Sequence, residues 1–154
     1  MRDNRVVTET GTTALPHALA DIRDEFLALG LKDRLQLLLE FSNELPELPE
    51  HLRDKTDLFE QVVECQSPVF IDVKIEDAAV QLYATAPRES PTTRGFASIL
   101  VQGITGLSPA EVLAIPSDFP QMLGLGEAVS PLRLRGMSGM LGRTKRQIAA
   151  KSAA

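Results

Sequence analysis

The chain has 154 residues, of which 44% are hydrophobic and 24% are charged, and its formal net charge is -5. This length and composition are typical of one domain with a single hydrophobic core. The sequence has no run of about 18 apolar residues and its N-terminus lacks the order of a secretory signal. We therefore expect a cytoplasmic protein with no membrane partner.

The acidic net charge hides a basic C-terminal segment. Residues 131–154 contain no carboxylate side chain, and their cations are Arg133, Arg135, Arg143, Lys145, Arg146 and Lys151. Nucleic acid could bind such a segment, but aromatic residues make up 5% of the chain and do not alternate with these cations. We expect Lys145, Arg146 and Lys151 to lie on a solvated helix face, and we expect no nucleic-acid partner.

The first part of the chain predicts a disordered lead-in followed by two helices. Residues 1–13 are polar and aperiodic, which is typical of disorder. Apolar residues from Leu15 to Leu29 recur every three or four positions, which predicts a helix that ends at Gly30. A second helix is predicted from Asp33 to about Glu44, and an irregular exposed loop follows it.

The middle of the chain predicts a β-hairpin. Apolar and polar residues alternate over Val69–Glu76 and again over Val80–Ala86, with a connection that lacks an Asn-Gly or Asp-Gly turn signal. A third strand is expected over Leu58–Val63, because two strands alone are marginally stable in water. The predicted fold class is α+β, with an antiparallel sheet of about three strands packed by helices.

Proline next to serine or threonine marks the starts of the later helices. The expected caps are Thr92 or Thr93 after Pro91, Ser108 before Pro109, Ser117 after Pro116, and Ser130 before Pro131. The last helix should end near residue 150, with a disordered tail over residues 151–154, so that residues 14–150 form one domain.

Three glycines recur in this last helix, at Gly136, Gly139 and Gly142. Each glycine costs a helix about 1 kcal/mol relative to alanine. We expect them to compensate for this cost by forming a flat face for close packing.

The supply of chemically active side chains is small. The chain has one cysteine, Cys65, and two histidines, His17 and His51, which are too few for a structural zinc site or a thiolate-held iron–sulfur cluster. Neither histidine has a sequence context that marks it as a base for the thiol. We expect no resident metal or cofactor, and we do not assign a self-contained enzyme.

A single thiol still permits sulfur transfer. A thiolate can accept sulfur from the persulfide of a partner, because the partner supplies both the electrophile and the leaving thiolate. The alternative is that Cys65 only fills space in the core, as free cysteines often do. Its position just before a β-branched run, with Pro68 stiffening the loop, favours a loop tip that can both hide and expose the thiol.

Several motifs, taken in order, resemble the SufE family of cysteine desulfuration proteins. The resemblance extends from about Leu19 to Ala150. The motifs are Arg34-Leu35, Leu45-Pro46-Glu47-Leu48, Cys65-Gln66-Ser67 with Val69-Phe70, Thr93-Arg94-Gly95-Phe96-Ala97, and Ser130-Pro131-Leu132-Arg133 leading to Gly136.

The resemblance implies a fold shared with IscU-like scaffolds and a persulfide carried on Cys65. The sulfur would come from a SufS-type cysteine desulfurase, which keeps its own pyridoxal phosphate, and would go to a SufBCD-type iron–sulfur scaffold. The carrier would also stimulate the desulfurase by clearing its persulfide. The alternative is a non-covalent regulator of the desulfurase in which Cys65 is structural.

The chain departs from the family pattern next to the thiol. Glu64 stands where the family usually has Gly, and Phe70 replaces the commoner Trp. A carboxylate beside Cys65 should raise the pKa of its thiol. Arg133, together with the positive end of the last helix, is our candidate for the compensating charge.

Three further residues are candidates for the site through the resemblance. Gln66 and Ser67 are expected to shape a pocket that shields the persulfide. Arg94 is left as a possible contact to the cysteine loop or to the partner.

Overall fold

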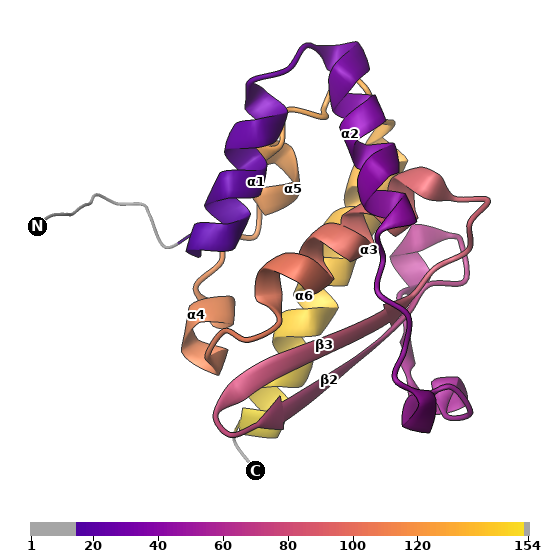
Figure 1. Ribbon diagram of the computed structural model, residues 1–154, viewed down its shortest axis with the longest axis vertical. Helices are drawn as coiled ribbons and strands as arrows, with labels where there is room; N and C mark the ends of the chain where they lie inside the picture. The colour runs from indigo at the N-terminus through magenta and orange to yellow at the C-terminus, as the bar shows by residue number, and fades with distance from the viewer. Residues whose placement is uncertain (1–14, 153–154) are drawn as a thin grey trace, which may run out of the picture.

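The computed structural model describes residues 15–152, which form helices around a three-stranded antiparallel sheet (Figure 1). This confirms the predicted α+β class, whereas the lead-in expected over residues 1–13 lies outside the described residues. The elements are α1 (His17–Leu27), α2 (Leu31–Asn43), β1 (Glu60–Gln61), β2 (Phe70–Glu76), β3 (Ala79–Thr85), α3 (Pro91–Ile104), α4 (Pro109–Leu113), α5 (Phe119–Met122) and α6 (Pro131–Ser152). Short 3₁₀ turns, η2 (Glu50–Leu52), η3 (Thr56–Leu58) and η4 (Val63–Cys65), lie between α2 and β2.

The sheet has one buried face, as the alternating pattern predicts. The central strand β2 pairs antiparallel with β1 on one side and with β3 on the other. Val73 and Leu82 lie opposite each other and are buried, whereas Lys74 on the other face is exposed. The apolar side of the sheet therefore forms one wall of the core.

The expected third strand is present but short. Only Glu60 and Gln61 are paired with β2. The turns η3 and η4 take up both ends of the predicted range Leu58–Val63, because the chain bends there to bring Cys65 around to β2.

The β2–β3 connection is a tight turn of two residues. Asp77 and Ala78 both have positive φ, 53° and 64°. Two consecutive left-handed residues are typical of a type I′ turn, whose twist matches that of the flanking strands. A left-handed conformation costs a residue with a Cβ about 1–2 kcal/mol, so the turn at Ala78 is strained.

Two long helices cover the sheet. α3 packs against β3 and α6 against β2, and buried Phe96 and Met140 from these helices join one core with the sheet. α1 and α2 form a hairpin whose arms diverge from their connection (Figure 1), as the short linker predicts. Arg34 fastens this hairpin to the rest, because its guanidinium donates at 2.8 Å to the carbonyls of both Phe26 and Gly124.

α6 also covers an open strand edge. β1 ends before Val73, whose backbone groups have no strand neighbour on that side. Gln147 Oε1 accepts from the Val73 amide at 2.9 Å, and Lys151 Nζ donates to the Val73 carbonyl. Because an unpaired edge invites association with other chains, these two side chains protect the sheet.

Two of the predicted helix caps are correct. At α4, Ser108 Oγ accepts from the Glu111 amide at 3.1 Å, and the Glu111 carboxylate accepts from the Ser108 amide at 2.9 Å. At α6, Ser130 Oγ accepts from the Arg133 amide at 3.2 Å. Both follow from local hydrogen bonding that sequence alone can indicate.

Other helix ends differ from the prediction. The residue before α3 is Ser90 rather than Thr92 or Thr93, because Pro91 takes the first helical position. Asp118 rather than Ser117 precedes α5. α6 extends to Ser152, into the range 151–154 where we expected a tail. No helix within residues 15–152 is both long and apolar enough to cross a membrane.

Ala78→Gly should stabilise the protein, because glycine adopts the left-handed conformation without the Cβ penalty. We expect a gain of about 1 kcal/mol in the free energy of unfolding, or about 2–4 °C in melting temperature for a domain of this size. Thermal and urea denaturation measure it. The matched control is Ala79→Gly in β3, which should destabilise by about 0.5–1 kcal/mol; equal effects of the two changes would contradict the strain at Ala78.

Candidate functional site

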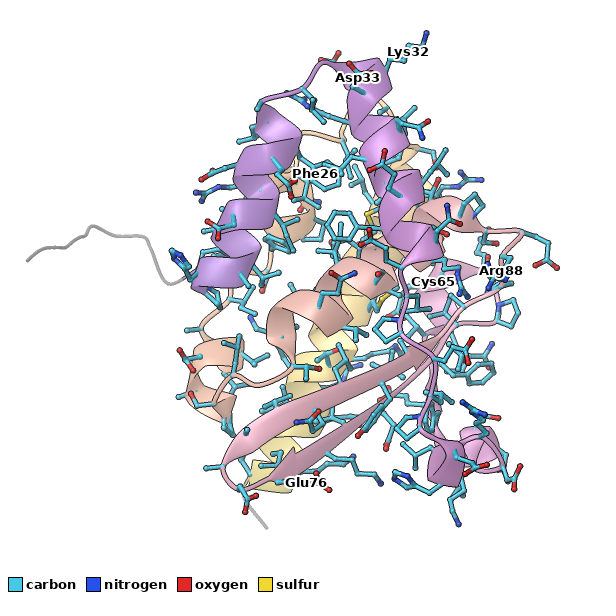
Figure 2. All side chains as sticks on the ribbon, in the orientation of Figure 1. Phe26, Lys32, Asp33, Cys65, Glu76 and Arg88 are labelled. Carbon is cyan, nitrogen blue, oxygen red and sulfur yellow. The ribbon has the colours of Figure 1, made fainter. Side chains whose placement is uncertain are left out.

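Cys65 lies at the end of the sheet opposite the β2–β3 turn that follows Glu76 (Figure 2). It is the last residue of η4, and its amide donates to the Val62 carbonyl at 3.1 Å. Gln66 then adopts a left-handed conformation with φ of 60°, which reverses the chain toward β2. The expected loop tip is thus a short helical turn ended by a left-handed residue.

The turn η4 packs directly on two glycines of α6. A Cβ added to Gly136 would lie 3.1 Å from Cys65 Cα, and one added to Gly139 would lie 2.9 Å from Glu64 Cβ. The close-packing face predicted for the glycines is therefore confirmed at these two positions. It is wrong for Gly142, where a Cβ would meet open space.

The Cys65 thiol is held in a protonated state. It is half-buried, and Sγ donates to the Gly136 carbonyl at 3.5 Å. Burial, followed by the Glu64 carboxylate, raises the pKa of the thiol to about 11, against a weaker lowering by Arg143. Because the thiolate is the nucleophile, this protein alone presents a weakly reactive cysteine at neutral pH.

Arg143 on α6 holds Glu64 in place. Its Nε and Nη2 donate to the two carboxylate oxygens of Glu64 at 2.8 and 3.3 Å, and its Nη1 donates to Glu60 at 2.7 Å. The hydrogen bond from Arg143 lowers the pKa of Glu64 despite partial burial, so the carboxylate stays charged. This bidentate contact between Arg143 and Glu64 holds η4 against α6.

Glu60 extends the contact to the sheet edge. Burial raises its pKa, but hydrogen bonds from Gln147 and Arg143 outweigh burial and leave the pKa lowered. Gln147 Nε2 donates to Glu60 at 2.9 Å, while its Oε1 binds the Val73 amide. We call Glu60, Glu64, Arg143 and Gln147 the Arg143 clamp, because together they join η4, β1, β2 and α6.

A pocket of about 370 Å³ opens beside Cys65. The first turns of α3 and α6 form its walls together with the residues that follow η4. The hydroxyls of Ser67 and Ser90 lie 2.8 Å apart and link two of these walls. The lining residues are Cys65, Gln66, Ser67, Ser90, Thr92, Thr93, Ser130, Leu132 and Arg133.

Gln66, Ser67 and Arg133 line the same pocket as Cys65, as predicted. The role of Arg133 differs from the predicted one. Arg133 is exposed, and its Nη1 donates to Thr92 Oγ1 at 3.4 Å. The cation that acts on the thiol is Arg143. The predicted compensating charge of Arg133 is therefore supplied by Arg143 instead, because Arg143 binds Glu64 directly beside Cys65, whereas the Arg133 side chain donates to Thr92.

Arg94 lies away from the cysteine turn. Its Nε donates to the Ser42 carbonyl at 2.9 Å, and its Nη1 donates to the Ala86 carbonyl at 2.6 Å. It thereby ties the last turn of α2 to the residue after β3. Within the described residues Arg94 makes no hydrogen bond to the Cys65 turn, so that suggested contact is not formed.

Sequence reasoning missed Arg143, Glu60 and Gln147. One signal was available: Arg143 follows Gly139 by four residues and so shares its helix face. The acidic partners of Arg143 could not be read in the same way, because they come from segments far away in the chain. Within residues 15–152, no group of three or more His, Cys, Asp or Glu side chains could hold a metal ion.

Comparison with known proteins assigns the family. Residues 20–148 match the family model described as SufE, Fe-S metabolism associated domain. The chain belongs to the SufE family. A SufE-like protein of Mycobacterium tuberculosis is 50% identical over 140 residues, which are 90% of this chain and 96% of the relative.

Solved and curated relatives agree with this assignment. A solution structure of a hypothetical protein from Thermus thermophilus matches with a TM-score of 0.79 and 35% identity, covering 91% of this chain and 99% of that chain. The cysteine desulfuration protein SufE of Plasmodium vivax is 26% identical over 65% of this chain and 39% of its own length. The resemblance seen in the motifs is confirmed, and it connects this SufE-family chain with iron–sulfur metabolism.

Gly139→Ala should loosen the cysteine turn, because the new Cβ would lie 2.7 Å from Glu64 Cδ. Gly142→Ala is the matched control, with open space around the added methyl group. We expect Gly142→Ala to stabilise the protein by about 1 kcal/mol and Gly139→Ala to lack that gain and to speed the alkylation of Cys65. Urea denaturation and iodoacetamide kinetics measure both effects. Identical behaviour of the two variants would refute the close packing.

Glu64→Gln should lower the pKa of the Cys65 thiol, because it removes a carboxylate that disfavours the thiolate. In the unchanged protein the alkylation rate should rise with pH toward a midpoint near 11. We expect a lower midpoint in the variant and alkylation several-fold faster at pH 8. The midpoint reports charge, and the plateau rate at high pH reports accessibility.

Glu60→Gln is the control for this prediction. It removes the second carboxylate bound by Arg143 and leaves Glu64 beside the thiol. Its midpoint should stay near that of the unchanged protein. A midpoint shift in Glu60→Gln as large as that in Glu64→Gln would show that the carboxylate next to Cys65 is not the cause.

Proposed function

We propose that this protein accepts sulfur on Cys65 from the persulfide of a SufS-type cysteine desulfurase and passes it to a SufBCD-type iron–sulfur scaffold. The observation that carries the proposal is the position of the single thiol: Cys65 borders a pocket with room for an added sulfur atom, in a chain of the SufE family. The proposal places the protein in the cytoplasm, where free thiols stay reduced.

The transfer step is a thiol–persulfide exchange. The Cys65 thiolate attacks the outer sulfur of the partner's persulfide, and the bond between that sulfur and the partner's cysteine breaks. The electron pair leaves on the partner's cysteine, which is restored as a thiolate and can begin another cycle. Pyridoxal phosphate takes part only in the partner, and clearing the persulfide raises the partner's turnover.

The resting geometry makes the step depend on docking. A thiol with a pKa near 11 is almost entirely protonated at neutral pH. The partner must therefore shift the Cys65 turn or its surroundings before the sulfur atom can attack. Val63 in η4 and Leu132 at the pocket are 60% and 42% exposed, and such apolar side chains around the thiol suit a protein partner.

A second function is favoured by the hydrogen bond from Cys65 to Gly136. A half-buried thiol that donates to a backbone carbonyl is also what a structural cysteine would do. In this alternative the protein is a non-covalent regulator that stimulates the desulfurase by docking alone.

Loading with sulfur separates the two functions. The protein is incubated with a SufS-type desulfurase, pyridoxal phosphate and cysteine, and its intact mass is measured under non-reducing conditions. We expect the unchanged protein to gain the mass of one or more sulfur atoms and Cys65→Ser to gain none. Desulfurase turnover should rise only with the unchanged protein. A rise in turnover that persists in Cys65→Ser, without any mass gain, would support the regulator instead.

A further inference from the structure

The N-terminal turns of two long helices, α3 and α6, line the pocket beside Cys65. Thr92 and Thr93 come from α3, and Leu132 and Arg133 come from α6. The N-terminus of a helix carries partial positive charge and free amide donors. No Asp or Glu side chain is among the lining residues. The described surroundings of the pocket therefore favour a negatively charged occupant.

The first turn of α3 has no side-chain N-cap, although a serine, Ser90, occupies the N-cap position. Ser90 precedes the helix but makes no side-chain capping hydrogen bond, because its hydroxyl pairs with Ser67 instead. The first amides of α3 are left without the acceptor that an N-cap side chain normally supplies. An anion in the pocket would provide that acceptor.

A buried hydroxyl at the same place also lacks a partner. Thr93 is 7% exposed and lines the pocket. The side-chain hydrogen bonds of the pocket walls join Ser67 to Ser90, Arg133 to Thr92, Ser130 to the Arg133 amide and Cys65 to the Gly136 carbonyl. Within residues 15–152 none reaches the Thr93 hydroxyl. Leaving a buried hydroxyl unpaired is unfavourable, so its position at the pocket indicates a ligand that accepts a hydrogen bond.

We propose that this pocket binds, as an anion, the terminal sulfur of a persulfide on Cys65, with Thr93 and Arg133 as its donors. The inference rests on the proposed function of Cys65 as a sulfur acceptor. It adds the chemical state of the cargo and the side chains that hold it.

The terminal sulfur of a persulfide on Cys65 would lie in different surroundings from the Sγ atom of the unloaded thiol. Cys65 Sγ faces the Gly136 carbonyl and lies beside Glu64, and neither of these residues lines the pocket. A second sulfur, about 2.05 Å from Sγ, carries the negative charge away from these acceptors and toward the donors of the pocket. The site therefore disfavours a thiolate on Sγ and favours the persulfide anion, which makes transfer onto Cys65 more favourable.

The charged groups around Cys65 are few. Glu64 lies on η4, Arg143 and Arg133 lie on α6, and the residues that α3 contributes to the pocket are uncharged. Arg143 is occupied by Glu64 and Glu60. Arg133 is thus the one cation among the lining residues that can pair with the terminal sulfur.

The test forms the persulfide without a desulfurase. Cys65 of the full-length protein is first converted at alkaline pH into a mixed disulfide with dithiobisnitrobenzoate. Hydrosulfide then attacks Sγ, the bond between Sγ and the aryl sulfur breaks, and the aryl thiolate leaves with the electron pair. One sulfur–sulfur bond replaces another, and the product is Cys65 persulfide. Its ionisation midpoint is read from the near-ultraviolet absorbance of the persulfide anion as pH varies.

Two variants remove the proposed donors. Thr93→Val keeps the side-chain shape without the hydroxyl, and Arg133→Gln removes an exposed cation. Each should raise the persulfide midpoint by about one pH unit, because one hydrogen bond to a charged group is worth at least about tenfold in an equilibrium constant. Arg133→Gln should leave the midpoint for alkylation of the unloaded thiol unchanged, since Arg133 does not act on Sγ.

Thr144→Val is the matched control. Thr144 is buried on α6 outside the pocket, and its hydroxyl donates to the Met140 carbonyl at 2.8 Å. Its persulfide midpoint should equal that of the unchanged protein. Persulfide midpoints that are the same in all four proteins overturn the proposal, and if Thr93→Val fails to fold in thermal denaturation, the exposed Arg133→Gln decides alone.

The persulfide midpoint test and the desulfurase loading test can fail independently of each other. No desulfurase takes part, so unchanged midpoints would overturn the anion pocket while mass gain in the desulfurase assay still supported sulfur acceptance. Conversely, a midpoint shift without any mass gain from a desulfurase would show a pocket suited to persulfide in a protein that does not receive sulfur by the proposed route.

Discussion

The packing of the turn η4 on the glycine face of α6 is the contact on which the site depends. Gly136 and Gly139 have no side chains, so Cys65 and Glu64 approach the helix more closely than any larger residue would allow. This approach buries the thiol, presents it to the Gly136 carbonyl and brings Glu64 within reach of Arg143. The thiol's raised pKa and its place at the pocket follow from the same contact.

The Glu64 carboxylate and the Arg143 guanidinium have opposite effects on the pKa of the Cys65 thiol. Glu64 alone would be an unfavourable neighbour for a sulfur nucleophile, but Arg143 binds it and partly offsets its effect on Cys65. The result is a cysteine that stays protonated at rest, and a protonated thiol is less open to oxidation than a thiolate. Such a thiol needs a change in its surroundings to become a thiolate at neutral pH, and the proposed transfer assigns that change to the docked partner.

The same helix holds the sheet and the cysteine turn. Gln147 and Lys151 cover the open edge of β2, while Arg143 binds Glu64 one turn earlier along α6. Glu60 remains bound to both Arg143 and Gln147, so Arg143 stays anchored if Glu64 is released. The contacts that cover the strand edge are therefore separate from the contact between Arg143 and Glu64 that holds η4.

Sequence alone determined what depends on neighbours along the chain. The alternation in β2 and β3, the caps at Ser108 and Ser130 and the family motifs are all patterns of neighbouring residues, and each was predicted correctly. Arg133 was placed at the pocket, but the cation that acts on the thiol is Arg143; the suggested contact of Arg94 to the cysteine loop is not formed, because Arg94 donates to Ser42 and Ala86. Tertiary structure alone decided that Arg143 meets Glu60 and Glu64, and that the first turns of α3 and α6 converge beside Cys65. The reason is physical: the energy of a charge pair or a hydrogen bond depends on distances in space, and only the folded chain sets those distances between segments far apart in sequence.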